Sequence, residues 1–247
     1  MALGIFAVLF VLMATPLFNV QEVTVSAGSH FSEDQIKAMA RVTTGKSFLR
    51  LNRADIAKRL KRDPWIRSAS VSWRLPHRAA IAVTERRPLA RIYALGDSLL
   101  VADDGTILES GWRANQAGIL EVMDKTDETV SGRRGQRVEF QDSDGVLSLL
   151  RLIIANASRI QVQPGKVELQ DNGHVQITFD GNFPTLTFWS RASAPKAFEA
   201  LLEAYDDDPT ILAGGQSVVG ISDKTLVVTP ASRIASANGK SGGKGAT

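Results

Sequence analysis

Three histidines carry the most versatile side-chain chemistry in this chain of 247 residues: His30, His77 and His174. An imidazole serves as a general base or as a metal ligand, and metal sites on helices usually place two of them at a spacing such as H-x-x-x-H. No two of these histidines have that spacing, and each falls in an expected turn or at a strand edge. The histidines therefore predict solvated turn residues, with no metal site and no catalytic base.

Two other stretches have residue types that can bind a ligand. The acidic run Asp206 to Asp208 could attract a divalent cation, but it also suits the end of a helix that must stop before Pro209. The glycines in "AGGQSVVG" lack both the G-x-G-x-x-G spacing and the Lys-Ser/Thr ending of phosphate-binding loops. We therefore expect no catalytic residue, no cofactor and no small-molecule substrate, so that the protein is not an enzyme.

Composition narrows the function further. The chain has 29 Lys and Arg against 26 Asp and Glu, and this mild excess does not indicate a nucleic-acid partner. The basic cluster from Lys58 to Arg62 is expected to be the solvated end of a helix. The absence of cysteine excludes disulfides, Cys-ligated zinc and thiol catalysis. Surfaces, rather than an active site, should carry the function.

The sequence begins with an apolar run. Ala2 to Phe18 carries no charge and would span about 26 Å as a helix, slightly less than a hydrocarbon core of about 30 Å. We expect a transmembrane helix over residues 1–18, with a cleaved signal peptide and a buried core helix as the alternatives. The first basic residue after the run is Lys37, so charge leaves the orientation open. We expect a basic cytoplasmic tail to precede this chain and most of the protein to lie outside the cytoplasm.

Residues 19–87 predict a small β-α-α-β-β unit. Ser32 and Gln35 form a capping box for the first helix, Asn52 caps the second, and Pro64 ends it. Two helices of this kind can cover one face of a three-stranded sheet. The expected elements are a strand over Val20 to Val25, a helix over Glu33 to Arg41, a helix that follows Asn52, and strands over Ser68 to Leu75 and Ala79 to Glu85.

The stretch "RDPWIRSASVSWRLPH" in this unit carries two tryptophans. Its alternation places Val71 and Trp73 on the buried face of a strand, and Trp65 closes the end of the preceding helix over the sheet. Exposed aromatic anchors for a partner are the alternative reading. Together with the stop at Pro64 and the turn at Pro76, these residues are predicted to be structural.

Residues 88–230 predict a larger β-rich region with two helices, joined to the first unit by the linker "ERRPLARI", and residues 231–247 predict a disordered tail. The whole chain is therefore of the α+β class. The expected elements are strands over Leu99 to Ala102 and Thr106 to Leu108, a helix over Gly145 to Ala157, a hairpin from Lys166 to Phe179, a returning strand over Thr185 to Trp189, a helix over Pro195 to Tyr205, and strands over Ser217 to Ile221 and Thr225 to Val228.

Several short motifs resemble the FtsQ/DivIB family of bacterial cell-division proteins. They are D-P-W-I-x-x-A-x-V at Asp63 to Val71, Leu75-Pro76, the exit Val83-Thr84-Glu85-Arg86-x-Pro88, and Asp104-Gly105. The resemblance runs from Phe18 to Leu108, and beyond it the order of elements alone agrees. It implies that residues 19–87 are a POTRA domain beside the membrane and that residues 88–230 are a β domain.

The resemblance also implies a function. The protein would be a single-pass scaffold of the cell (inner) membrane at the division septum, without catalysis, linking early septal proteins to peptidoglycan synthesis. Its partners would be single-pass proteins of the FtsB/FtsL type and septal peptidoglycan synthases. One alternative is a POTRA-containing secretion or outer-membrane assembly factor, which should continue into further POTRA repeats or a long β-rich membrane domain. The other is an extracytoplasmic enzyme, which should have a convergent polar pocket around one of the three histidines.

A partner segment can add to an open sheet edge as a further strand, because edge strands leave backbone N–H and C=O groups unpaired. The last expected strand lies beside the tail and is the candidate edge. The hypothesis assigns partner binding to Thr225, Leu226, Val227 and Val228.

Overall fold

The computed structural model describes residues 19–230 with gaps at 46, 48–50, 75–76, 96, 113–117, 127–129, 131, 162, 181–183, 213–215 and 223–224. The expected transmembrane helix at residues 1–18 and the expected tail at residues 231–247 lie outside the described residues. Among the helices that are described, none is both long and apolar enough to cross a membrane. The chain divides into two compact units, Met1–Arg87 and Pro88–Thr247.

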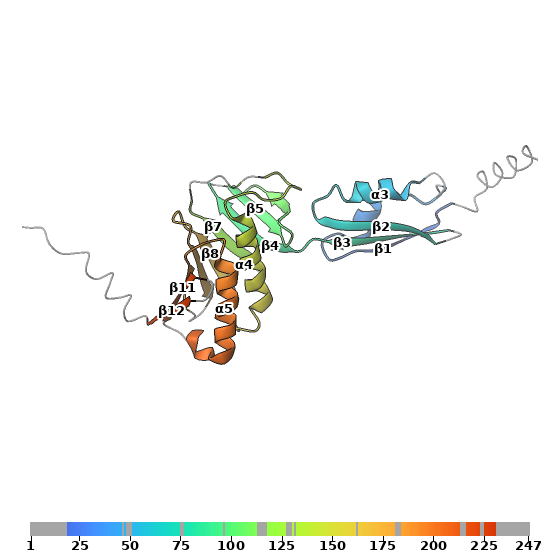
Figure 1. Ribbon diagram of the computed structural model, residues 1–247. Coiled ribbons are helices and arrows are strands. Elements are labelled where there is room, and N and C mark those ends of the chain that lie inside the picture. Colours follow the sequence, from blue (N-terminus) through green and yellow to red (C-terminus); the bar gives the residue numbers. More distant parts are fainter. Residues whose placement is uncertain are drawn as a thin grey trace, which may run out of the picture. The chain divides into compact units, whose positions relative to one another are not determined.

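The first unit has the predicted β-α-α-β-β order. Its elements are β1 (Glu22–Ser26), α2 (Glu33–Ala40), α3 (Arg53–Leu60), β2 (Ile66–Arg74) and β3 (Arg78–Glu85). The strands form a sheet in the order β1-β3-β2, in which β1 runs parallel to β3 and β2 runs antiparallel to it. Figure 1 shows α3 lying along one face of this sheet.

The helix starts of this unit follow the predicted capping residues. The Ser32 side chain accepts a hydrogen bond from the Gln35 backbone N–H, and the Gln35 side chain accepts one from the Ser32 N–H, so the capping box is complete. Asn52 caps α3 through the Ala54 N–H at 2.9 Å. The helix ends at Leu60, earlier than predicted, because the chain leaves it through turns before it reaches Pro64.

The core of the first unit lies between its helices and its sheet. Ile36 and Ala40 of α2 and Ile56 and Leu60 of α3 are buried against the strands. From the sheet, the residues that share this cluster alternate along each strand, as expected for a sheet with one covered face. They are Val23, Val25, Ile66, Ala69, Val71, Trp73, Ala79, Ile81 and Val83.

The second unit is a mixed sheet with two long helices. In chain order its elements are β4 (Pro88–Ala94), β5 (Asp97–Ala102), β6 (Ile107–Ser110), β7 (Leu120–Asp124), α4 (Ser143–Asn156), β8 (Gln163–Leu169), β9 (Val175–Asp180), β10 (Leu186–Phe188), α5 (Ala194–Asp207), the 3-10 turn η3 (Pro209–Leu212), β11 (Gln216–Ser222) and β12 (Thr225–Pro230). The strands form one nine-stranded sheet in the order β12-β11-β10-β9-β8-β7-β4-β5-β6. Figure 1 shows α4 and α5 side by side along the sheet.

Two strands of this sheet were not predicted. The stretch expected to be a linker contains β4, in which five consecutive residues are buried, from Leu89 to Tyr93. A strand buried on both faces shows no polar alternation, and Pro88 at its start suggested an end of regular structure. The other strand, β7, has five residues and lies between β4 and β8, parallel to both. Residues that were predicted to be a linker therefore form an inner strand of the nine-stranded sheet.

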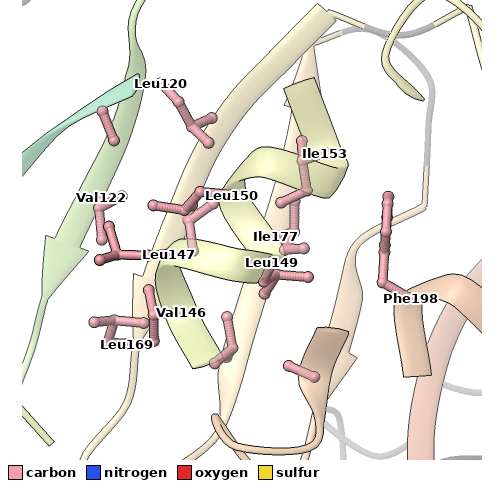
Figure 2. Packing of buried hydrophobic residues seen from close by; sticks show 14 of the residues in the cluster. Leu120, Val122, Val146, Leu147, Leu149, Leu150, Ile153, Leu169, Ile177 and Phe198 are labelled. Atoms are coloured by element: carbon pink, nitrogen blue, oxygen red, sulfur yellow. The ribbon is translucent and has the colours of Figure 1, made fainter. Parts of the chain in front are cut away.

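Helix α4 contributes five buried apolar side chains to the core of the second unit. Its buried residues are Val146, Leu147, Leu149, Leu150 and Ile153. Figure 2 shows these side chains directed toward apolar residues of β7, β8 and β9, with Phe198 of α5 beside them. Burial at spacings of three and four residues is the pattern of a helix with one apolar face.

Candidate functional site

The candidate partner-binding residues fall on β12, at one end of the nine-stranded sheet. β12 pairs antiparallel with β11, with Gly220 opposite Leu226, Val219 opposite Val227 and Val218 opposite Val228. Helix α5 runs beside both strands. The strand ends at Pro230, which has no backbone N–H, and proline within a sheet is found mainly on edge strands.

The opposite edge of the same sheet is covered. β6 exchanges backbone hydrogen bonds with the segment that follows β7: the Ile107 N–H donates to the Gln136 carbonyl, and the Gly135 N–H donates to the Ile107 carbonyl, both at 2.8 Å. The Arg134 Nε also donates to the Leu108 carbonyl at 3.1 Å. Within the described residues, β12 has a partner on its β11 side alone, so the two edges of this sheet differ in their capacity to accept a further strand.

The histidines do not converge. His30 stacks on Trp65 with ring centroids 3.6 Å apart, whereas His174 lies 5.8 Å from the ring of Trp189 in the other unit. The described part of the chain contains no cluster of three side chains able to hold a metal ion.

The aspartate run lies at the end of α5, and two of its members, Asp206 and Asp208, have partners within the chain. Arg159 forms an ion pair with Asp206. Asp208 accepts hydrogen bonds from the Thr210 hydroxyl at 2.6 Å and the Thr210 N–H at 2.9 Å, which hold the pKa of that carboxyl below its ordinary value. These contacts tie the end of α5 to Arg159 and to the turn that follows the helix.

The residues predicted to be structural lie as follows. Pro64 and Trp65 are buried at the turn between α3 and β2, and Val71 and Trp73 are half-buried and pack against the core. Pro76 lies outside the described residues.

Two side chains of the Val83-Thr84-Glu85-Arg86 motif, Glu85 and Arg86, hold the segments around Trp65 through hydrogen bonds to the backbone. The Glu85 carboxylate accepts hydrogen bonds from the backbone N–H groups of His30 at 2.9 Å and Phe31 at 3.0 Å. The Arg86 guanidinium donates to the Pro64 carbonyl at 2.8 Å and the Ile66 carbonyl at 2.9 Å. The Val-Thr-Glu-Arg motif thus fixes both the loop before α2 and the turn before β2.

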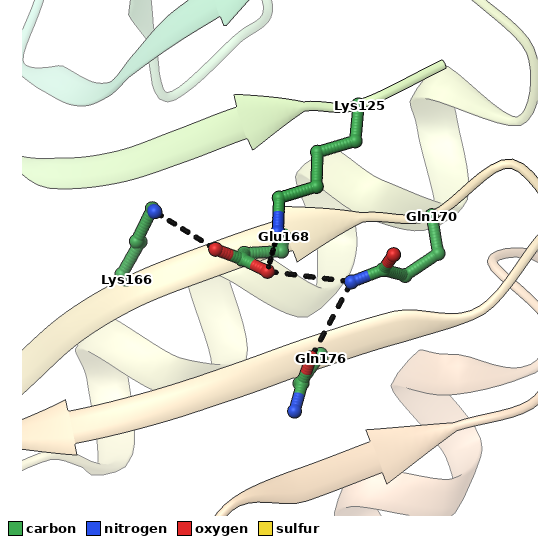
Figure 3. A network of polar contacts seen from close by, with 5 residues as sticks. All are labelled: Lys125, Lys166, Glu168, Gln170 and Gln176. Atoms are coloured by element: carbon green, nitrogen blue, oxygen red, sulfur yellow. Dashed lines mark hydrogen bonds and ion pairs between the residues drawn. The ribbon is translucent and has the colours of Figure 1, made fainter. Parts of the chain in front are cut away.

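The face of the large sheet away from the helices carries a polar network, shown in Figure 3. Lys125 donates to the Glu168 carboxylate, Lys166 pairs with it at 2.8 Å, and Gln170 links Glu168 to Gln176. The hydrogen bond from Lys125, followed by that from Lys166, lowers the pKa of Glu168. Charged and amide side chains on this face explain how a sheet with helices on one side remains solvated on the other.

Comparison with known proteins assigns the first unit. Residues 18–86 match the family model described as POTRA domain, FtsQ-type. The chain is 32% identical over 95 residues to the cell division protein DivIB of Geobacillus kaustophilus, covering 38% of this chain and 36% of the relative. It is 32% identical over 92 residues to the cell division protein FtsQ of Bradyrhizobium diazoefficiens, covering 37% of this chain and 27% of the relative.

A third relative, the cell division protein FtsQ of a Geobacter species, is 29% identical over 96 residues, covering 39% of this chain and 35% of the relative. The chain thus spans about a third of the length of the curated relatives that it matches. The matched family model covers the unit built around Trp65, Glu85 and Arg86. Over residues 18–86 the chain is therefore similar to POTRA domains of the FtsQ type, and it shares this unit with proteins named as FtsQ and DivIB cell division proteins.

Proposed function

We propose that this protein is a non-catalytic scaffold of the bacterial cell-division machinery, which links early septal proteins to peptidoglycan synthesis. The observation that carries the proposal is the FtsQ-type POTRA domain, which the chain shares with relatives named as cell division proteins. A protein of this kind acts through its surfaces.

The proposed partner site is the open edge of β12. A partner strand placed beside Thr225 to Val228 would pair with backbone groups that β11 does not use, and its alternate side chains would give specificity. The partners proposed are single-pass proteins of the FtsB/FtsL type, with septal peptidoglycan synthases joined through them. Support for this edge over the other comes from the segment that covers β6.

The proposal includes a membrane anchor. The run Ala2 to Phe18 carries no charge and a single hydroxyl, that of Thr15, and Asn19 follows it in the sequence. We propose that it spans the cell membrane once, with both compact units on the extracytoplasmic side, and that the protein gathers at the septum.

Two substitutions test the partner edge. In Leu226→Glu/Val228→Glu, two like charges are placed on β12, and we expect loss of the FtsB/FtsL pair from a pull-down with purified proteins. The matched control is Ser70→Glu/Ser72→Glu, which adds the same charge to exposed positions of β2, an end strand of the other sheet. Equal capture by both variants would show that β12 is not the partner edge.

Localisation tests the function as a whole. A fluorescent fusion of the full chain, expressed in dividing cells, should form a band at midcell. A uniform envelope signal contradicts the division role and favours the alternative of a secretion or assembly factor.

A further inference from the structure

The two units carry opposite net charges. Residues 19–87 contain fourteen Lys and Arg against six Asp and Glu, whereas residues 88–230 contain twelve against twenty. The near-neutral total hides this asymmetry. A strongly basic unit next to an apolar run indicates an anionic surface as its surroundings.

The sheet register gathers arginines at one end of the first unit. Arg74 lies directly opposite Arg78 on β2 and β3, and Arg78 lies opposite Glu22, the first residue of β1. Arg78 Nε pairs with the Glu22 carboxylate at 2.7 Å, and among the described residues Arg74 has no acidic partner. Like charges directly opposite each other destabilise a sheet. Glu22 offsets the charge of Arg78, and an anion at this end would offset the charge of Arg74.

The same end is where the apolar run joins the unit, and the junction is held by backbone hydrogen bonds. Asn19 forms a bridge with Ser47, and the Val20 carbonyl accepts from the Gly45 N–H at 2.8 Å. The Gln21 N–H donates to the His77 carbonyl at 2.8 Å. The three residue steps from Asn19, which follows the apolar run, to Glu22 span at most about 11 Å when fully extended. The arginines therefore lie close to the point where the apolar run ends.

We propose that Arg74 and Arg78 bind the phosphates of anionic lipids at the surface of the bilayer that residues 2–18 span. The inference rests on the membrane anchor of the proposed function. A guanidinium presents parallel N–H donors that match two phosphate oxygens, which suits arginine at both positions. Lipid is favoured over a nucleic acid or the acidic unit of a second copy because the chain itself delivers these arginines to the membrane.

The test uses residues 19–247, which keep every residue of both cores, the first being Val20. Binding is measured by co-sedimentation with vesicles of phosphatidylglycerol and phosphatidylcholine, and with vesicles of phosphatidylcholine alone. We expect binding to the anionic vesicles, weakened by salt, and about a tenfold or greater loss in Arg74→Gln/Arg78→Gln. Urea unfolding shows that the variant remains folded.

The matched control is Lys61→Gln/Arg62→Gln, which removes the same charge from exposed residues in the turn after α3. That turn leads to Ile66, whose register partner is Glu85, so it lies at the opposite end of the sheet from Glu22. The control should bind like the unaltered chain. An equal loss in both variants, or binding independent of lipid charge, overturns the proposal. So does self-association without vesicles that the arginine variant abolishes.

The membrane anchor is tested separately on the full chain. Alkaline extraction of cell membranes should leave the protein in the membrane fraction whether or not Arg74 and Arg78 are replaced. Release of the unaltered full chain contradicts the anchor, while vesicle binding by residues 19–247 reports on the arginines independently.

Discussion

The Glu85 carboxylate holds the loop before α2 in the POTRA domain. It accepts from the N–H groups of His30 and Phe31, and a Cβ placed on Gly28 would lie 2.2 Å from its Oε2. We expect Glu85→Ala to lower the free energy of unfolding by about 1–2 kcal/mol, since two backbone donors lose a charged acceptor. Urea denaturation measures this loss.

Gly28→Ala should also destabilise the domain, because the added methyl group displaces the same carboxylate. In the Glu85→Ala background the methyl group has space, so the cost should shrink. Urea unfolding of the two single variants and the double variant gives the coupling between them. Strictly additive losses would show that Gly28 and Glu85 act independently.

Glu168 should make stability depend on pH. Its pKa is lowered in the folded chain by hydrogen bonds from Lys125 and then Lys166, so its contribution is complete above the unfolded pKa and is lost as pH falls through the lower, folded value. The advantage of the unaltered chain over Glu168→Gln should therefore be larger at pH 7 than at pH 3, by up to about 1 kcal/mol for each partly exposed pair. Urea unfolding at both pH values measures it, and an advantage that grows toward pH 3 contradicts the assignment.

At the scale of elements, α4 offers two adjacent isoleucines in opposite surroundings. Ile153 is 0% exposed and Ile154 is 41% exposed. Ile153→Ala should cost about 2–5 kcal/mol through the cavity that it leaves, whereas Ile154→Ala should cost less than about 1 kcal/mol. Thermal unfolding compares the two variants. Similar losses of stability would contradict the assignment of Ile153 to the buried face of α4 and of Ile154 to its exposed face.

Elements with local signals were predictable from sequence. Ser32 and Asn52 cap the helices of the first unit as expected, and the helix after Ser193 carries Pro195 in its first turn. The strand β4 was not predictable by alternation, since Arg91 and Tyr93 on one face are buried as well as Ala90 and Ile92 on the other. Buried polar residues give a strand of this kind the appearance of a linker.

At the scale of the molecule, the proposed partner edge belongs wholly to the second unit. We expect residues 88–247 to capture the FtsB/FtsL pair in a pull-down and residues 1–87 to fail, once circular dichroism shows that each fragment is folded. Capture by the first unit alone would move the partner site to the edges of the POTRA sheet. The result does not depend on the lipid-binding arginines.

The sequence predicted the candidate partner strand but not the arginine pair. The last strand was identifiable as an edge because it precedes a tail rich in serine and glycine. The pair Arg74 and Arg78 could not be placed near the start of β1 from sequence, because Glu22 is far from both in the chain and is brought to them by its pairing with β3. In sequence order Lys37 is the first basic residue after the apolar run, yet the sheet register places Arg78 opposite Glu22 and Arg74 opposite Arg78.

The covered edge at β6 has a consequence for assembly. If the segment around Gln136 blocks one side of the sheet, pairing through β12 is monovalent. Two copies joined edge to edge by β12 would form a closed twofold pair, and no third copy could extend the sheet into a fibre. A partner edge of this kind would add one strand and then stop, so its stoichiometry would be set by the architecture of a single sheet.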